Sequence, residues 1–202
     1  MLVTKIYQGN EVNSIVDNIS KMRINEFRNF PYMYDGSLEY ERLYFQEFCK
    51  DPNSLIVCIF DDSKLIATAT SIPLLSNADI LDNVASKFIA QSLDPKTFFY
   101  SGEFIVLQKY RQNGLCKNLL YSVESLAKTL GFTNLCIATV CRSKDDPRRP
   151  VSYVDSDVVW KSLGFEITNI KTSYPWPTIQ PNQLTVTVNN EMIFWTKEMG
   201  RS

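Results

Sequence analysis

Residues 110–120 (YRQNGLCKNLL) are the part of the sequence best suited to bind an anion. Gly114 stands where a predicted strand gives way to a predicted helix, and the first amides of a helix have no intrahelical acceptor. These amides and the positive end of the helix dipole attract phosphate, and glycine lets it approach the backbone closely. Arg111 and Lys117 add positive charge. A glycine before a helix is also a common plain turn, so both interpretations stay open.

The residue composition excludes several other kinds of catalytic site. The sequence has no histidine, which rules out Ser/His/Asp and Cys/His nucleophilic arrangements. Its five cysteines form no CxxC pair, so we expect no metal site and reduced, mostly buried thiols. They are Cys49, Cys58, Cys116, Cys136 and Cys141.

Length and charge point to one globular domain over residues 1–202. Apolar residues make up 45% of the chain and charged residues 21%, which is average for such a domain. Twenty-one basic against 22 acidic residues leave a net charge of −1, so we expect no nucleic-acid or membrane partner. The first residues lack the apolar run of a signal peptide, and a cytoplasmic location is expected.

Hydrophobic periodicity predicts the elements that position the loop. Before it we expect two amphipathic helices, an antiparallel hairpin and a helical insertion. The strand leading into the loop, the helix after it and the next buried strand form a βαβ unit, so these two strands should be parallel. The chain should end with a short helix and two strands separated by a proline-bearing loop. The expected strands are 3–7, 54–60, 64–72, 98–107, 134–140, 166–172 and 192–197. The expected helices are 38–49, 80–93, 115–130 and 156–163, preceded by one that begins at residue 12 and ends near Phe30-Pro31.

The segment EFIVLQKYRQNGLCKNLL resembles motif A of the GCN5-related N-acetyltransferases (GNAT), and VVWKSLGFEI resembles their motif B. The order of elements and the spacing of the two motifs agree along nearly the whole chain. FPYMYDG, RRPVSY and MIFWTKEM further resemble one subgroup of these acetyltransferases, without indicating its acceptor. The resemblance implies an α/β (α+β) GNAT fold, with a mixed central sheet splayed between two parallel strands and flanked by helices.

The resemblance also implies which residues bind acetyl-CoA, the acyl donor. Phe104, Ile105 and Val106 match strand positions that contact the pantetheine arm. The sequence departs from the motif at Cys116, where the family prefers glycine or alanine, which implies a slightly tighter loop. The positions that match the pyrophosphate loop are Arg111, Gln112, Asn113, Gly114, Leu115 and Cys116, with Lys117 beside them.

An amine acceptor must lose a proton before it attacks a thioester, so a general base is expected near the split strands. Glu103, where the superfamily often keeps a glutamate, is the candidate, although a strand-end glutamate facing solvent is equally compatible with the sequence. The superfamily often protonates the departing thiolate with a tyrosine, but that position is Trp160, whose indole only donates hydrogen bonds. Tyr153 is the nearest replacement; alternatively it packs on the loop and water protonates the thiolate.

The acceptor is expected beside Tyr32, Tyr34 and Asp35, because aromatic rings and a carboxylate suit a cationic amine. These rings could equally cover an edge of the core. Residues 143–150 (SKDDPRRP) are interpreted as an exposed loop, and residues 174–177 (YPWP) as a rigid aromatic loop.

The function predicted from these residues is acetyl-CoA-dependent N-acetylation of a primary amine on a small molecule or peptide. A catalytically silent acyl-CoA-binding sensor or interaction module is the alternative, supported by Trp160. Nucleotide on the loop is disfavoured, because no GxxxxGK[ST] or GxGxxG pattern is present. Coenzyme A and an amine are the expected partners of a monomer or homodimer.

Overall fold

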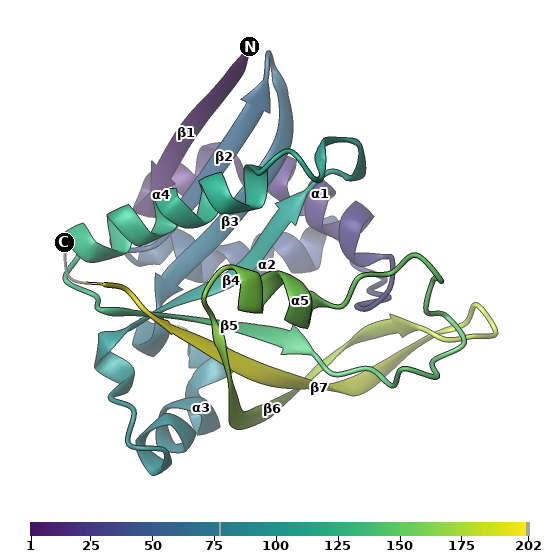
Figure 1. Cartoon of the computed structure of the whole chain (residues 1–202). Coiled ribbons are helices and arrows are strands. Elements are labelled where there is room, and N and C mark those ends of the chain that lie inside the picture. The colour runs from purple at the N-terminus through teal and green to yellow at the C-terminus, as the bar shows by residue number, and fades with distance from the viewer. Residues whose placement is uncertain (77, 201–202) are drawn as a thin grey trace.

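The chain forms one mixed seven-stranded β-sheet with helices on both faces (Figure 1). The computed structural model describes residues 1–76 and 78–200. Within these residues the strand order is β1-β2-β3-β4-β5-β7-β6, with β4 and β5 parallel and every other neighbouring pair antiparallel. The strands are β1 (Leu2–Gln8), β2 (Leu55–Asp61), β3 (Lys64–Pro73), β4 (Phe98–Val106), β5 (Asn134–Val140), β6 (Glu166–Ile179) and β7 (Thr185–Glu198).

Two helical layers cover the sheet. α1 (Val16–Phe27) and α2 (Leu38–Lys50) lie behind it in Figure 1, whereas α4 (Leu115–Thr129) and α5 (Ser156–Ser162) lie in front. α3 (Ala78–Ala90) connects β3 to β4. Alternate residues of β2 enter separate cores: Ile56 packs with α1 and α2, and Val57 with α4. β2 is therefore buried on both faces, which explains its continuous apolar sequence. No described helix has both the length and the apolar character needed to cross a bilayer.

The splayed sheet implied by the family resemblance is confirmed. β4 and β5 pair only from Phe98↔Asn134 to Ser101↔Ile137 within the described residues. Beyond this point β4 pairs with β3 and β5 with β7, so the two parallel strands separate. The separation begins at a β-bulge, where Gly102 is skipped between the pairs Ser71↔Ser101 and Thr70↔Glu103.

The bulge also changes which residues of β4 face each core. Before it, even-numbered residues such as Tyr100 face α1 and α2; after it, odd-numbered residues such as Ile105 do. Phe104 consequently joins the core under α4. A bulge inserts one residue and so inverts the alternation of a strand.

The expected loop at residues 174–177 is wrong, since YPWP lies inside β6 and the β6–β7 hairpin is much longer than predicted. β6 is an edge strand, the position at which a sheet tolerates proline. The carbonyl of Pro177 faces away from β7 and accepts a hydrogen bond from the amide of Asp35 (2.9 Å). The N–H group that proline lacks would point to the same outer side, so its absence removes no hydrogen bond between β6 and β7.

Candidate active site

The loop before α4 has the geometry of an anion site. Gly114 precedes the helix with a left-handed backbone (φ 75°), and the first intrahelical bond runs from Asn118 N to Gly114 O (3.0 Å). The amides of Leu115, Cys116 and Lys117 therefore have no intrahelical acceptor. A Cβ on Gly114 would meet nothing within 4 Å, so this side of the loop is open. Both features match those expected of a phosphate-binding helix N-terminus.

Several predicted loop residues have structural partners. Arg111 donates from Nε to Val106 O (2.9 Å) and from Nη2 to Glu26 Oε2 (2.7 Å), so it ties the loop to β4 and α1. The Asn113 side chain donates to two carbonyls of its own turn. Gln112 has a left-handed backbone (φ 63°). Burial raises the pKa of the Cys116 thiol to about 11, so it stays neutral and does not repel an anion.

The predicted pantetheine positions lie where β4 has separated from β5. Phe104 and Val106 face the α4 side, and Ile105 is buried on the other side. Trp160 on α5 packs edge-on against Phe104 (5.4 Å between centroids) and Phe165 (5.5 Å). Because this half of β4 pairs only with β3, the backbone groups on its other edge face the split.

A cavity of about 120 Å³ opens on the opposite face of the sheet. Tyr32 and Tyr34 line it as expected, whereas Asp35 does not. Asp35 instead pairs with Arg28 (2.5 Å) and accepts a hydrogen bond from Thr185 (2.7 Å). Most of the wall is aromatic and comes from five separate elements and a loop, so apart from Tyr32 and Tyr34 no local sequence pattern indicates it. The aromatic lining residues are Phe27, Tyr32, Tyr34, Tyr40, Tyr44, Tyr100, Tyr174, Trp176 and Phe194.

Glu103 and Arg23 bring charge to this cavity. Glu103 is 6% exposed, so the alternative of a solvent-facing glutamate is wrong. Arg23, which sequence reasoning missed, donates to Glu103 Oε2 and to Glu41 Oε2 (2.5 Å), and Tyr34 donates to Glu41 Oε1 (2.9 Å). Glu103 Oε1 makes no hydrogen bond of regular geometry among the described residues, although the Thr70 hydroxyl lies near enough to the Glu103 carboxylate to lower its pKa. Burial raises the pKa of Glu103 despite the opposing effect of Arg23.

Tyr153 lies beside the cavity and does not line it. Its ring packs edge-on against Phe30 (4.7 Å) and under the Arg149 guanidinium (4.9 Å). Burial raises the pKa of Tyr153, and burial followed by the proximity of Tyr153 raises that of Tyr32 to about 12. The Tyr153 hydroxyl is thus close to a ring that does line the cavity.

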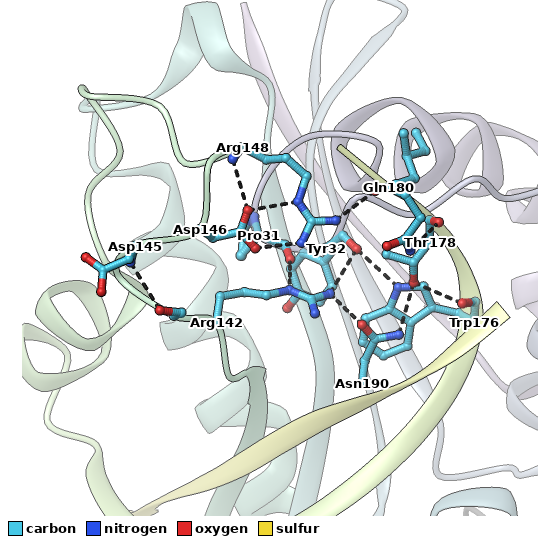
Figure 2. Close-up of polar contacts among 12 residues, drawn as sticks. Pro31, Tyr32, Arg142, Asp145, Asp146, Arg148, Trp176, Thr178, Gln180 and Asn190 are labelled. Carbon is cyan, nitrogen blue, oxygen red and sulfur yellow. Dashed lines mark hydrogen bonds and ion pairs between the residues drawn. The ribbon is translucent and has the colours of Figure 1, made fainter. Parts of the chain in front are cut away.

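A polar network holds Tyr32 in this wall (Figure 2). Arg142, just after β5, donates to Pro31 O (2.7 Å), Tyr32 O (3.4 Å) and Asn190 Oδ1 (2.5 Å). Trp176 Nε1 also donates to Tyr32 O (3.1 Å). These bonds connect the α1–α2 loop to β5, β6 and β7, and no sequence motif indicated them.

The two arginines of the expected exposed loop are also partly buried. Arg148 binds Asp146 (2.6 Å) and donates to Ile179 O (2.8 Å), and Arg149 binds Asp155 (2.8 Å). They brace the loop against the end of β6 and the start of α5.

The sheet opens between parallel strands, with the unpaired amides of a helix N-terminus at one side and an acid-containing cavity at the other. This is the architecture of an acyl-CoA-dependent acyltransferase. The family model described as the Acetyltransferase (GNAT) family matches residues 21–150, and the chain belongs to this family. The protein is therefore an acetyltransferase of the GNAT class.

Solved structures share the fold at low sequence identity. The ribosomal-protein-S18-alanine N-acetyltransferase of Escherichia coli is 12% identical, with 100% of this chain and 96% of that chain covered (TM-score 0.57). An N-acetyltransferase of Staphylococcus aureus Mu50 is 10% identical, with 98% and 99% covered (TM-score 0.61). Salmonella typhimurium yncA, solved with its cofactor acetyl-CoA, is 11% identical, with 98% and 95% covered (TM-score 0.55). No curated protein matches the sequence.

Proposed function

We propose that this acetyltransferase uses acetyl-CoA to acetylate a primary amine that enters through the aromatic cavity. The observation that carries the proposal is the position of Glu103. Its buried carboxylate lies where β4 separates from β5, lines the cavity and has one oxygen that makes no hydrogen bond of regular geometry among the described residues. A base in this position can reach a group that arrives from the cavity.

The residues of the split fit the donor. The amides of Leu115, Cys116 and Lys117 would hold its pyrophosphate, with the Lys117 side chain adding charge, and the open side of Gly114 leaves room for it. Phe104, Ile105 and Val106 would contact its pantetheine arm. Acetyl-CoA, when bound, supplies a thioester that an uncharged amine can attack.

Glu103 Oε1 is the proposed proton acceptor. The amine arrives as an ammonium ion and gives one proton to Oε1. Its nitrogen then bonds to the acetyl carbon as the C–S bond breaks, and the N-protonated amide releases its second proton to solvent. The raised pKa of Glu103 makes it a stronger base than an ordinary carboxylate. The departing thiolate takes a proton from the Tyr153 hydroxyl or from water, because the indole of Trp160 does not act as an acid.

The test measures thiol release from acetyl-CoA with a panel of small amines, amino acids and peptides. We expect turnover, and a fall in kcat of about 10²-fold or more for Glu103→Gln. Glu124→Gln is the matched control, because Glu124 is a partly buried carboxylate paired with Lys197 away from the cavity. Unchanged kcat in Glu103→Gln would remove the proposed base. Coenzyme binding by calorimetry without turnover of any amine would favour a silent binding module.

A further inference from the structure

The cavity has an unusual balance of charge for a site that receives an amine. Arg23 and Glu103 are the charged residues of its lining. Arg23 is shared between Glu103 and Glu41, which is fully buried, so the three groups together carry a formal charge of −1. An entering ammonium ion would neutralise that charge. An entering carboxylate would add to it.

The other described cations around the cavity are already occupied. Arg142 donates to two carbonyls and to Asn190, and Arg28 pairs with Asp35 on the outer side of the α1–α2 loop. Lys171, next to a lining residue on β6, pairs with Glu191 (2.8 Å). A buried carboxylate without a cation or hydrogen-bond donors is strongly disfavoured. The cavity therefore offers the carboxylate of an amino acid no unpaired cation among the described residues, and only neutral donors such as the tyrosine hydroxyls of its lining.

The size and the walls of the cavity limit the rest of the molecule. Its volume of about 120 Å³ is comparable to the roughly 150 Å³ cavity that holds benzene in another protein. Aromatic rings such as Tyr44, Tyr100 and Trp176 surround this space. Such walls favour an aromatic or branched alkyl group and attract a cation to their faces.

From these observations we infer that the acceptor is a small primary amine with an aromatic or branched apolar body and no carboxylate. The inference rests on the proposed function, since it assigns the substrate class of the same site. This substrate class differs from amino acids and peptide N-termini, because the cavity does not match the polar groups of those acceptors.

The experiment compares pairs of acceptors that differ by one carboxylate: phenethylamine with phenylalanine, tyramine with tyrosine, and isoamylamine with leucine. A dipeptide with an N-terminal alanine is added as a seventh acceptor. We expect kcat/KM to be at least about 100-fold higher for each amine than for its amino acid, because the site would have to bury an unpaired charge. Equal or higher kcat/KM for the amino acids or the dipeptide overturns the inference and leaves the proposed function intact.

A gain-of-function variant supplies an independent test. Thr172 lines the cavity, whereas Ser173 points to the other face of β6 and is exposed. Thr172→Lys should raise the relative kcat/KM for phenylalanine over phenethylamine at least tenfold, and Ser173→Lys should not. The same shift in both variants would overturn the assignment of the cavity. If no acceptor is acetylated, the proposed function fails, but the inference can still be tested by calorimetry. Each amine and its amino acid are titrated into the complex of the protein with coenzyme A. Tighter binding of the amines supports the inference, and tighter binding of the amino acids refutes it.

Discussion

Arg23 is the residue whose removal should disturb the protein most. Its guanidinium bridges the buried carboxylates of Glu41 and Glu103 and lies over the ring of Tyr44 (4.4 Å). Arg23→Met keeps much of the side-chain volume but removes the charge and all donors. Two carboxylates then remain buried without their cation.

The expected loss follows from this burial. Breaking a buried ion pair by removing one partner costs about 3–5 kcal/mol. In a chain of this size each kcal/mol lowers Tm by about 2–4 °C, so Tm should fall by about 6–20 °C. The matched control is Arg42→Met on α2, whose pair with Asp17 is similarly short (2.8 Å) but exposed. Solvent screens that pair, so its loss should lower Tm much less.

The pH dependence of the loss tests the cause. Arg23 lowers the pKa of Glu103, so its removal should raise that pKa further above the ordinary value of 4.5. Above pH 4.5 the folded variant then binds more protons than the unfolded chain, and its stability falls as pH rises. Urea unfolding should therefore show a larger loss for Arg23→Met at pH 8 than at pH 5. The reasoning is refuted if the loss is the same at both pH values, or if it matches that of Arg42→Met.

Three further predictions concern the proposed reaction. Because burial raises the pKa of Glu103, kcat should fall as pH decreases, through a pKa above 4.5. This acidic decrease should be absent when the residual kcat of Glu103→Gln is measured as a function of pH. Gly114→Ala and Gly131→Ala both place a side chain at positive φ in open space, so each should lower the free energy of unfolding by about 1 kcal/mol. Only Gly114→Ala should also raise the Kd for acetyl-CoA, by about tenfold. Equal Kd values for the two variants would contradict the assignment of the loop. If the Tyr153 hydroxyl protonates the thiolate, Tyr153→Phe should lower kcat at least tenfold. Tyr121→Phe, on an exposed part of α4, is the control and should leave kcat unchanged. An unchanged kcat in both variants assigns protonation of the thiolate to water.

Those parts of the fold that depend on local patterns could be predicted from the sequence. The helices and buried strands follow from periodicity, and the parallel β4–β5 pair follows from the strand–helix–strand order. The helix N-terminus at Gly114 was also predicted, because a single glycine at a strand-to-helix transition is a local signal. The first half of the edge strand β6 was predicted, but its second half was missed because the prolines there indicate a loop, and only the edge position in the sheet makes them acceptable.

Apart from Tyr32, Tyr34 and Glu103, the lining of the cavity could not be predicted, because its residues have no pattern in common along the chain. Arg23 lies in α1, where charged residues are usually exposed, and its partners are 18 and 80 residues away. Arg142 follows β5 and reaches carbonyls more than 100 residues earlier. Such contacts depend on tertiary structure. Glu103 was found through the family resemblance, but the sequence did not distinguish a buried from an exposed side chain at that position.

The bulge at Gly102 explains how one strand can serve both halves of the proposed site. Without it, Glu103 would continue the odd-numbered residues toward α4, and Phe104 would face the cavity. The inserted residue turns Glu103 toward Arg23 and Phe104 toward Trp160, at the same point where β4 separates from β5. A Cβ on residue 102 would lie 3.0 Å from the Tyr44 hydroxyl and 3.1 Å from Thr70 Oγ1, which disfavours any larger side chain there. The backbone at Gly102, a residue with no side chain to take part in the reaction, thus decides that Glu103 faces the cavity while Phe104 faces the proposed coenzyme side.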